Sequence, residues 1–257
     1  MARSSAGSPR RGRRCGPPGS TSPRRARVLA QAGTVLTERL TKQILAAYGI
    51  PVTREHMARD AEDAVAAAAA IGGPVALKIE SPDIAPQDRG RCDPAWRVGR
   101  GCGASRLRRR DGRRGALPAD ARLDGVLIQE MVPSGLEMIV GVSRDPTFGP
   151  VVLVGFGGIH AELLADTATG IAPLDRDEVA LMLASLRGAR LLDGWRGAAP
   201  RDQAALTDLI LRVSWLAHDL GDALAELDLN PVTLFDAGQG LRVVDALMVR
   251  RPAGDAQ

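Results

Sequence analysis

Aromatic residues are scarce in this chain of 257 residues, which has one tyrosine, three phenylalanines and three tryptophans. So few flat side chains leave little surface on which nucleic-acid bases could stack. Cysteine is equally scarce, and three cysteines provide no disulfide framework. No apolar run is long enough to span a bilayer, and the arginine-rich first residues lack the apolar core of a secretory signal. We therefore expect a cytoplasmic protein with no membrane partner.

The net charge of +4 conceals two strongly basic blocks. Eight arginines precede the first acidic residue, Glu38, and eleven arginines meet four aspartates between Ala85 and Arg122. The blocks carry +8 and +7, and subtracting them from +4 leaves −11 on the rest of the chain. Charge runs are typical of solvated segments, so we expect no nucleic-acid partner.

With 45% hydrophobic residues, the chain can bury a large core as one domain or two small lobes. Residues 1–34 have the composition of a disordered, arginine-rich tail. Helix caps, apolar periodicity and short β-branched runs predict the elements that follow. They are a helix capped by Thr37 with Leu40, Ile44 and Leu45 on its apolar face, a helix at Asp60–Ile71, and a strand at Val75–Ile79.

The stretch from Asp124 to Glu162 contains three short apolar runs separated by Pro or Gly. These runs predict strands of one sheet, at Val126–Ile128, Met138–Val142 and Val151–Val154. Two features of the stretch indicate a ligand site: polar groups at a strand terminus, and glycines that let the backbone approach a ligand closely. The residues concerned are Gln129 and Glu130 after the first run, and Gly157 and Gly158 after the third.

The remaining sequence predicts helices and strands in alternation, which is typical of an α/β (α+β) fold. The predicted helices are Asp175–Leu186 and Pro200–Leu220, and a polar turn is expected between Asp166 and Ile171. The predicted strands are Ala225–Leu229, Val232–Phe235 and Leu241–Ala246, with a turn at Asn230–Pro231. His218, near the end of the second helix, is interpreted as a surface histidine at a helix terminus rather than a ligand.

Oxygen ligands gather near the C-terminus. Glu226, Asp228 and Asn230 alternate along one extended segment and share a face, and the following hairpin can return Asp245 beside them. The set suits Mg²⁺, which takes one or two protein groups plus phosphates and water; the alternative is a polar strand edge. Lys78 has a similar pair of interpretations, as a solvated edge residue or as a phosphate ligand.

The region from Ala85 to Pro118 shows neither helical nor strand periodicity, and so long a structureless connection is unusual within a compact domain. One permitted back-translation of Pro86–Pro94, read one base later, encodes His-Lys-Thr-Glu-Val-Gly-Ala-Thr-Leu. We therefore hypothesise that residues 85–118 are a frameshifted segment.

Four motifs make the chain resemble the ATP-grasp domain of NDP-forming acyl-CoA synthetases. These enzymes are of the ADP-forming acetyl-CoA synthetase type and are related to the β subunit of succinyl-CoA synthetase. The motifs are PVALKI at Pro74–Ile79, VLIQEMV at Val126–Val132, the run from Gly135 to Glu162, and ELDLNP at Glu226–Pro231. The resemblance implies an ATP-grasp fold of two α/β lobes, 35–125 and 126–252, with the nucleotide in the cleft between them.

The resemblance also assigns roles to residues. It implies that Lys78 contacts the nucleotide phosphates and that Gln129 and Glu130 lie at the adenine hinge, with ATP or ADP and Mg²⁺ as cofactors. It implies Mg²⁺ ligation by Asn230 and Asp245, with Asp228 in the neighbouring acidic position. The implied partners are CoA-binding ligase domains or an α-type subunit.

Two departures from the family pattern qualify the implied reaction, which interconverts acyl-CoA, ADP and phosphate with carboxylate, ATP and CoA through a phosphohistidine. The family's HK(S/T)(D/E)VGG motif is replaced by APQDRGR at Ala85–Arg91, so no relay histidine stands near Pro86. The family's arginine before the APL motif is Gly170 here. We expect either a ligase lobe that is incomplete as this chain, or a non-catalytic nucleotide-binding remnant or regulatory lobe of a protein acetyltransferase.

Overall fold

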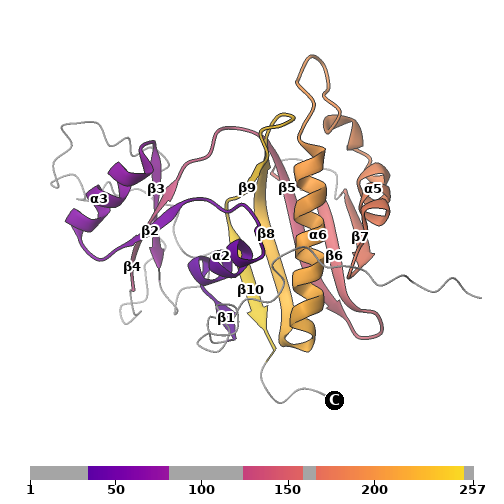
Figure 1. Ribbon diagram of the computed structural model, residues 1–257, viewed down its shortest axis with the longest axis horizontal. Helices are drawn as coiled ribbons and strands as arrows, with labels where there is room; N and C mark the ends of the chain where they lie inside the picture. The colour runs from indigo at the N-terminus through magenta and orange to yellow at the C-terminus, as the bar shows by residue number, and fades with distance from the viewer. Residues whose placement is uncertain (1–33, 81–123, 159–165, 252–257) are drawn as a thin grey trace, which may run out of the picture.

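The computed structural model describes residues 34–80, 124–158 and 166–251, which form a small and a large antiparallel sheet. The small sheet has the strand order β2-β4-β3, with β2 at Glu55–Ala58, β3 at Val75–Glu80 and β4 at Gly125–Glu130. Helix α3 (Ala61–Ile71) covers one face of this sheet. Asp60 caps the helix by accepting a hydrogen bond from the Asp63 backbone N–H at 2.9 Å. Figure 1 shows this unit on one side of the molecule and the large sheet on the other.

The large sheet has seven strands in the order β1-β10-β8-β5-β6-β7, and β9 pairs with the second half of β8. Their bounds are β1 Val35–Leu36, β5 Leu136–Asp145, β6 Gly149–Phe156, β7 Thr167–Ile171, β8 Leu224–Leu234, β9 Leu241–Val243 and β10 Ala246–Arg250. Alternate residues of the central strands are buried, as expected for a sheet with one covered face. The polar positions of β8, which include Glu226, Asp228 and Asn230, face away from that core.

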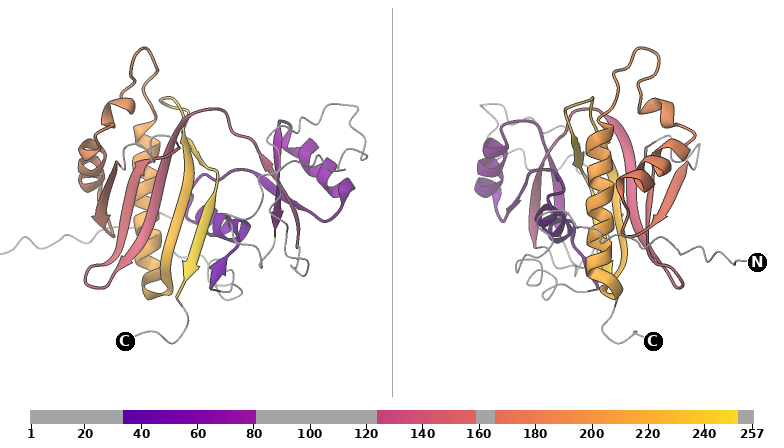
Figure 2. Two further views of the ribbon diagram at one scale, coloured as in Figure 1. Left: turned by 180° about the vertical axis from the view of Figure 1, so that it is seen from behind. Right: turned by 45° about the vertical axis from the view of Figure 1, so that its right-hand side comes forward.

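Helices α5 (Arg176–Ser185) and α6 (Gln203–Leu220) pack on the covered face, as the two views in Figure 2 show. Leu209, Ile210 and Val213 of α6 are fully buried against the sheet. A capping box joins Asp175 and Glu178 at the start of α5. Short 3₁₀ turns follow the helices at Ala189–Leu191 and Gly221–Ala223. Within the described ranges, no helix combines the length and hydrophobicity needed to cross a membrane.

The small sheet is inserted into the unit that contains the large one. Strand β1 pairs with β10, and α2 (Glu38–Ala47) packs its apolar side into the large core, so the chain enters the small sheet only after α2. It returns after β4, through residues 131–135. The two-lobed α/β architecture expected from the sequence is confirmed. The lobe limits 35–125 and 126–252 stay a prediction, but β1 and α2 lie with the large sheet and β4 with the small one.

Three local predictions were wrong. The runs at 126–128, 138–142 and 151–154 are strands, but β4 belongs to the small sheet whereas β5 and β6 belong to the large one. The Asn230–Pro231 turn is absent: β8 continues through it, and the register with β5 shifts between Met138 and Val140 to accommodate one extra residue in β8. The polar residues Thr167–Gly170 form most of β7 rather than a turn.

The C-terminal hairpin also differs from its prediction. The expected strand Leu241–Ala246 is divided into β9 and β10, which pair with different halves of β8. The predicted helices after Thr37, Asp60, Asp175 and Pro200 are confirmed, although α6 begins at Gln203 because Asp202 is its N-cap. Residues 1–33 of the predicted tail, the segment 85–118 and His160 lie outside the described residues.

Candidate functional site

Lys78 reaches from the small sheet towards the large one. Successive strand residues face opposite sides, so Leu77 points to α3 and Lys78 to the uncovered face. Its Nζ lies 2.9 Å from Oε1 of Glu38 and 2.7 Å from Oδ1 of Asp245. Glu38 begins α2 and Asp245 lies between β9 and β10, so the ammonium joins the two lobes. Figure 1 shows α2 between the sheets.

The predicted oxygen ligands do gather beside Asp245. The backbone N–H of Asn230 donates to the carbonyl oxygen of Asp245 at 3.2 Å. Asp228 pairs across the ladder with Leu247, two residues beyond Asp245, and shares its face of β8 with Glu226. The alternation predicted from the sequence is therefore confirmed, and so is the return of Asp245 to this position.

Mutual repulsion and burial shape the ionisation of these acids. Burial raises the pKa of Asp228, and the nearby charges of Glu226 and Asp245 raise it further. Burial acts in the same direction on Asp245, but the charges of Lys78 and Lys42 and the hydrogen bonds with Glu38 and Lys78 together outweigh it and lower the pKa of Asp245. Burial likewise would lower the pKa of Lys78, but Glu38 and Asp245 raise it. Lys78 is thus held as a cation beside the acidic cluster, which consists of Glu226, Asp228 and Asp245.

A second lysine, Lys42, lies behind this contact. Its side chain is 1% exposed, and its Nζ donates to Glu38 Oε1 at 2.6 Å, Thr53 Oγ1 at 2.8 Å and Glu55 Oε2 at 3.1 Å. Sequence analysis missed this whole group because Glu38 and Lys42 lie beside an apolar helix face that explained α2 without them. The i,i+4 spacing of Glu38 and Lys42 was the available signal.

Gln129 and Glu130 end β4, where the chain leaves the small sheet. The Gln129 side-chain amide donates to Thr53 Oγ1 and to the carbonyl oxygen of Val244, both at 2.9 Å. Its Oε1 is buried and has no partner among the described residues. An unpaired buried acceptor is costly unless a ligand supplies a donor. Whether a ligand contacts this acceptor stays a prediction.

The Glu130 carboxylate interacts with two arginines of the protein, Arg54 and Arg242. Its carboxylate accepts hydrogen bonds from the backbone N–H of Arg54 at 2.9 Å and from Arg54 Nε at 2.6 Å. Arg242 Nε is 3.8 Å from the same carboxylate. Burial acts to raise the pKa of Glu130, but the bonds and charge of Arg54 outweigh it and lower that pKa. Its carboxylate therefore links the end of β4 to Arg54, just before β2. Contact of Glu130 with a ligand stays a prediction.

Gly157 and Gly158, the two glycines after β6, lie against Glu137 of β5. Gly157 donates its N–H to the carbonyl oxygen of Glu137 on β5 at 2.8 Å, and Gly158 has a φ of +58°. A Cβ on Gly158 would lie 2.5 Å from Oε2 of Glu137. Close approach is therefore required here, but the partner in the described structure is Glu137, and contact with a ligand remains a prediction.

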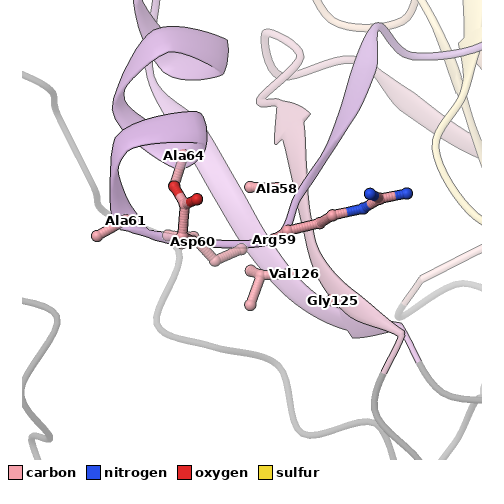
Figure 3. Close-up of a pocket in the computed structure, with 8 residues that line it drawn as sticks. Ala58, Arg59, Asp60, Ala61, Ala64, Gly125 and Val126 are labelled. Carbon is pink, nitrogen blue, oxygen red and sulfur yellow. The ribbon is translucent and has the colours of Figure 1, made fainter.

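A cavity of about 190 Å³ lies on the opposite face of the small sheet from Lys78. Ala64, Leu77 and Val126 supply much of its apolar lining, and Figure 3 shows the Arg59 side chain extending away from it. These residues continue the small core beneath α3. The cavity is a gap in packing beside that core and is remote from the charged cluster.

The two described histidines do not approach Lys78 or Asp245 through any recorded contact. His56 is exposed on β2. His218 is exposed in the last turn of α6, where its ring and that of Trp215 form a T-shaped pair with their centroids 5.5 Å apart. The interpretation of His218 as a surface histidine is confirmed.

Two sheets joined through Lys78 are the architecture expected of an ATP-grasp domain, which is a nucleotide-binding class. The family model described as ATP-grasp domain matches residues 27–90 and 111–249. The chain therefore belongs to the ATP-grasp family. The match omits residues 91–110, which fall inside the aberrant segment recognised from the sequence.

Within that class, the chain belongs with the β subunits of ADP-forming acyl-CoA ligases. It is 37% identical over 227 residues to subunit β of ADP-forming acetate–CoA ligase II of Pyrococcus furiosus, covering 86% of this chain and 94% of that subunit. It is 40% identical over 211 residues to ADP-forming acetate–CoA ligase I of Archaeoglobus fulgidus, covering 80% of this chain and 30% of the ligase. The chain thus spans nearly all of a separate β subunit but under a third of a single-chain ligase.

A solved structure agrees with this placement. The dinucleotide-forming acetyl-coenzyme A synthetase 1 of Candidatus Korarchaeum cryptofilum, in complex with coenzyme A and Mg-AMPPCP, superposes with a TM-score of 0.71 at 31% identity. The alignment covers 88% of this chain and 97% of that chain. The recognition and the fold class reached from the sequence are confirmed.

Proposed function

We propose that this chain is the nucleotide-binding β-type lobe pair of an ADP-forming acyl-CoA ligase, binding ADP or ATP with Mg²⁺ in the cleft between its two sheets. The observation that carries the proposal is the contact of Lys78, from the small sheet, with Asp245 of the large unit at 2.7 Å. Cationic side chains and metal ions stabilise the negative charge of a phosphoryl group during its transfer. The cleft offers a cationic side chain, Lys78, and a carboxylate suited to a metal, Asp245.

The donor set fits magnesium by its chemistry. Asp245, Asp228 and Asn230 present hard oxygen atoms, the ligands that Mg²⁺ prefers. In the described part of the chain, no three His, Cys, Asp or Glu side chains form a cluster sufficient to hold a metal alone. A Mg²⁺ ion bound here would therefore need water and phosphate oxygens to complete its coordination. Bound there, Mg²⁺ would neutralise phosphate charge, while Lys78 binds and orients the same phosphates.

The adenine end of the ligand is assigned to the hinge. Gln129 Oε1 is the buried acceptor without a described partner, and Gln129 is anchored at both Thr53 and Val244. An exocyclic amine is a donor of the required kind. Partner domains that bind CoA, either as an α-type subunit or on the same polypeptide, would complete the enzyme.

A second candidate function, nucleotide binding without catalysis, is favoured by one specific observation. APQDRGR stands at Ala85–Arg91, where the family carries its relay histidine. A lobe of this kind would bind nucleotide as a remnant or as a regulatory part of a protein acetyltransferase. An acetyltransferase domain encoded beside this chain would favour that function, whereas CoA-binding domains would favour the ligase.

Calorimetry with Mg²⁺ and ADP tests the shared nucleotide site. Removal of one charge-assisted contact costs about 1.5 to 3 kcal/mol, so Lys78→Ala and Asn230→Ala should each weaken affinity about tenfold to a hundredfold. Arg144→Ala is the matched control. Arg144 lies near the C-terminal end of β5 and forms an ion pair with Asp222, not with Lys78 or Asn230. Equal affinity for the wild type, Lys78→Ala and Asn230→Ala would refute the site.

A further inference from the structure

The chain has only two lysines among its 34 basic residues, and both donate to one oxygen atom. Lys42 Nζ and Lys78 Nζ lie 2.6 Å and 2.9 Å from Oε1 of Glu38. All other basic residues are arginines, whose forked guanidinium cannot concentrate its charge at a point as an ammonium does. Lysine therefore occurs only where two compact cations meet at one carboxylate.

Lys42 is fully engaged and cannot act on a ligand itself. Its three ammonium protons are matched by acceptors on Glu38, Thr53 and Glu55, and its side chain is 1% exposed. A buried ion pair is weak evidence for stability, because desolvation offsets much of the attraction. Its clear structural consequence is that the Glu38 carboxylate is fixed in one place.

The two carboxylates that hold Lys78 differ in what else they can do. The Asp245 side chain is 38% exposed and lies beside Asn230, whereas the Glu38 side chain is 9% exposed and is held by Lys42. A cation entering the acidic cluster would compete with Lys78 for Asp245. The Glu38 side chain also hydrogen-bonds to Asp245, but its ion pair with the buried Lys42 at 2.6 Å does not involve Asp245 and holds Glu38 in place when a cation binds there.

We propose that Glu38 is a positioning residue that keeps the Lys78 ammonium in the cleft when a cation occupies Asp245, and that Lys42 fixes Glu38 for this task. The inference rests on the proposed nucleotide site. It adds two residues, neither of which touches the nucleotide, to the machinery that holds the phosphate-binding lysine.

Glu38→Gln tests this role, since it removes the charge but preserves the shape and an acceptor for Lys42. We expect affinity for ADP in the presence of Mg²⁺ to fall at least tenfold, and to fall less when EDTA removes the metal and leaves Asp245 to hold Lys78. Asp208→Asn is the matched control: Asp208 pairs with Arg212 at i,i+4 on α6, at 2.6 Å, and its variant should bind within twofold of the wild type. An equal loss with and without Mg²⁺ would overturn the proposal.

Thermal unfolding of each variant shows whether Glu38→Gln is folded at the assay temperature. If it is not, Glu38→Asp replaces it, because it keeps the charge and the first-turn position that favours acids but shortens the reach towards Lys78. The same metal-dependent loss is expected from this variant. Affinity equal to that of the wild type would contradict the proposal.

A second measurement separates this inference from the nucleotide site. Lysine-selective ¹⁵N labelling yields only two side-chain ammonium signals, which Lys78→Met assigns. With Mg²⁺ present and no nucleotide, exchange of the Lys78 ammonium protons with water should be several-fold faster in Glu38→Gln than in the wild type or Asp208→Asn. Equal exchange rates would refute the positioning role even if ADP binds, whereas faster exchange in a protein that binds no ADP would refute only the nucleotide site.

Discussion

At the residue scale, the ionised side chain of Asp228 lowers the stability of the folded protein. Burial and the charges of Glu226 and Asp245 raise its pKa, which means that folding disfavours its ionised form. The resulting penalty is full above the raised pKa and disappears as the pH falls below the ordinary value of 3.8. Acids with a shifted pKa occur frequently at functional sites.

Asp228→Asn should therefore stabilise the protein at pH 7 without Mg²⁺. Relief of like-charge repulsion between neighbouring strand residues contributes about 0.2 to 1 kcal/mol, a rise of roughly 1 to 4 °C in the unfolding temperature of a chain of this size. Thermal unfolding at pH 7 and pH 3 measures the effect, and the difference should vanish at the lower pH. A variant less stable than the wild type at pH 7 would contradict this account.

Glu130 has the opposite electrostatic balance. Its pKa is lowered because the bonds from Arg54 outweigh burial, so it contributes stability that is present above its unfolded pKa of about 4.5 and is lost as the pH falls through the lower folded pKa. Glu130→Gln should lower the free energy of unfolding by about 1 to 2 kcal/mol at pH 7. Urea denaturation at pH 7 and pH 3 checks this, and the difference between the two proteins should be smaller at pH 3. The same difference at both pH values would exclude the Arg54 interaction as its cause.

At the scale of elements, the pairing of β6 with β7 depends on a missing side chain. A Cβ on Gly155 would lie 2.8 Å from the Asp166 carbonyl oxygen and 2.8 Å from Cγ2 of Thr167. The backbone oxygen cannot move away as a flexible side chain could. Gly155 thus allows the edge strand to close over the end of β6, near the Gly157 turn.

Gly155→Ala is accordingly expected to destabilise the fold by about 1 to 3 kcal/mol, the usual cost of overpacking. Gly73→Ala is its control, because nothing lies within 4 Å of a Cβ at Gly73 and its backbone is not left-handed. Chemical denaturation of both variants tests the prediction. Equal stability of Gly155→Ala and the wild type would show that β7 can shift without loss.

On the scale of the whole molecule, neither of the two described histidines lies with the Lys78–Asp245 contact. Phosphoryl relay needs an accepting group, and neutral imidazole is suited to that task near pH 7. The chain has three histidines, of which His56 and His218 are exposed elsewhere. His160 lies outside the described residues, and the family motif near Pro86 is absent.

We therefore predict that this chain, mixed with CoA-binding partner domains, forms no acyl-CoA from acetate, ATP and CoA above background. Replacing Pro86–Pro94 with His-Lys-Thr-Glu-Val-Gly-Ala-Thr-Leu, with the rest of the shifted segment restored, should recover turnover. A coupled assay for ADP release measures both. Robust activity of the unaltered chain that is lost in His160→Ala would show that the relay has moved and that the frameshift hypothesis is wrong.

Local sequence was sufficient for most elements and for part of the site. Caps and periodicity located α2, α3, α5 and α6, because they depend on residues three or four apart. Strand alternation also placed Glu226, Asp228 and Asn230 on one face, whereas the ligand roles of Lys78, Asp228, Asn230 and Asp245 were implied by the family resemblance and stay predictions. The family resemblance, carried by ELDLNP and the run from Gly135, was likewise readable from the sequence.

Only the tertiary structure decided which elements meet. An apolar run fixes that a strand forms but not which sheet it joins, so β4 could be separated from β5 and β6 only by its long-range pairing with β2 and β3. Pairing with β10, β5 and β9 likewise keeps β8 extended through a dipeptide whose local preference is a turn. Glu38 and Lys42 became visible as a site only when folding brought β3 to the start of α2, because their i,i+4 pattern is the same on any solvated helix face.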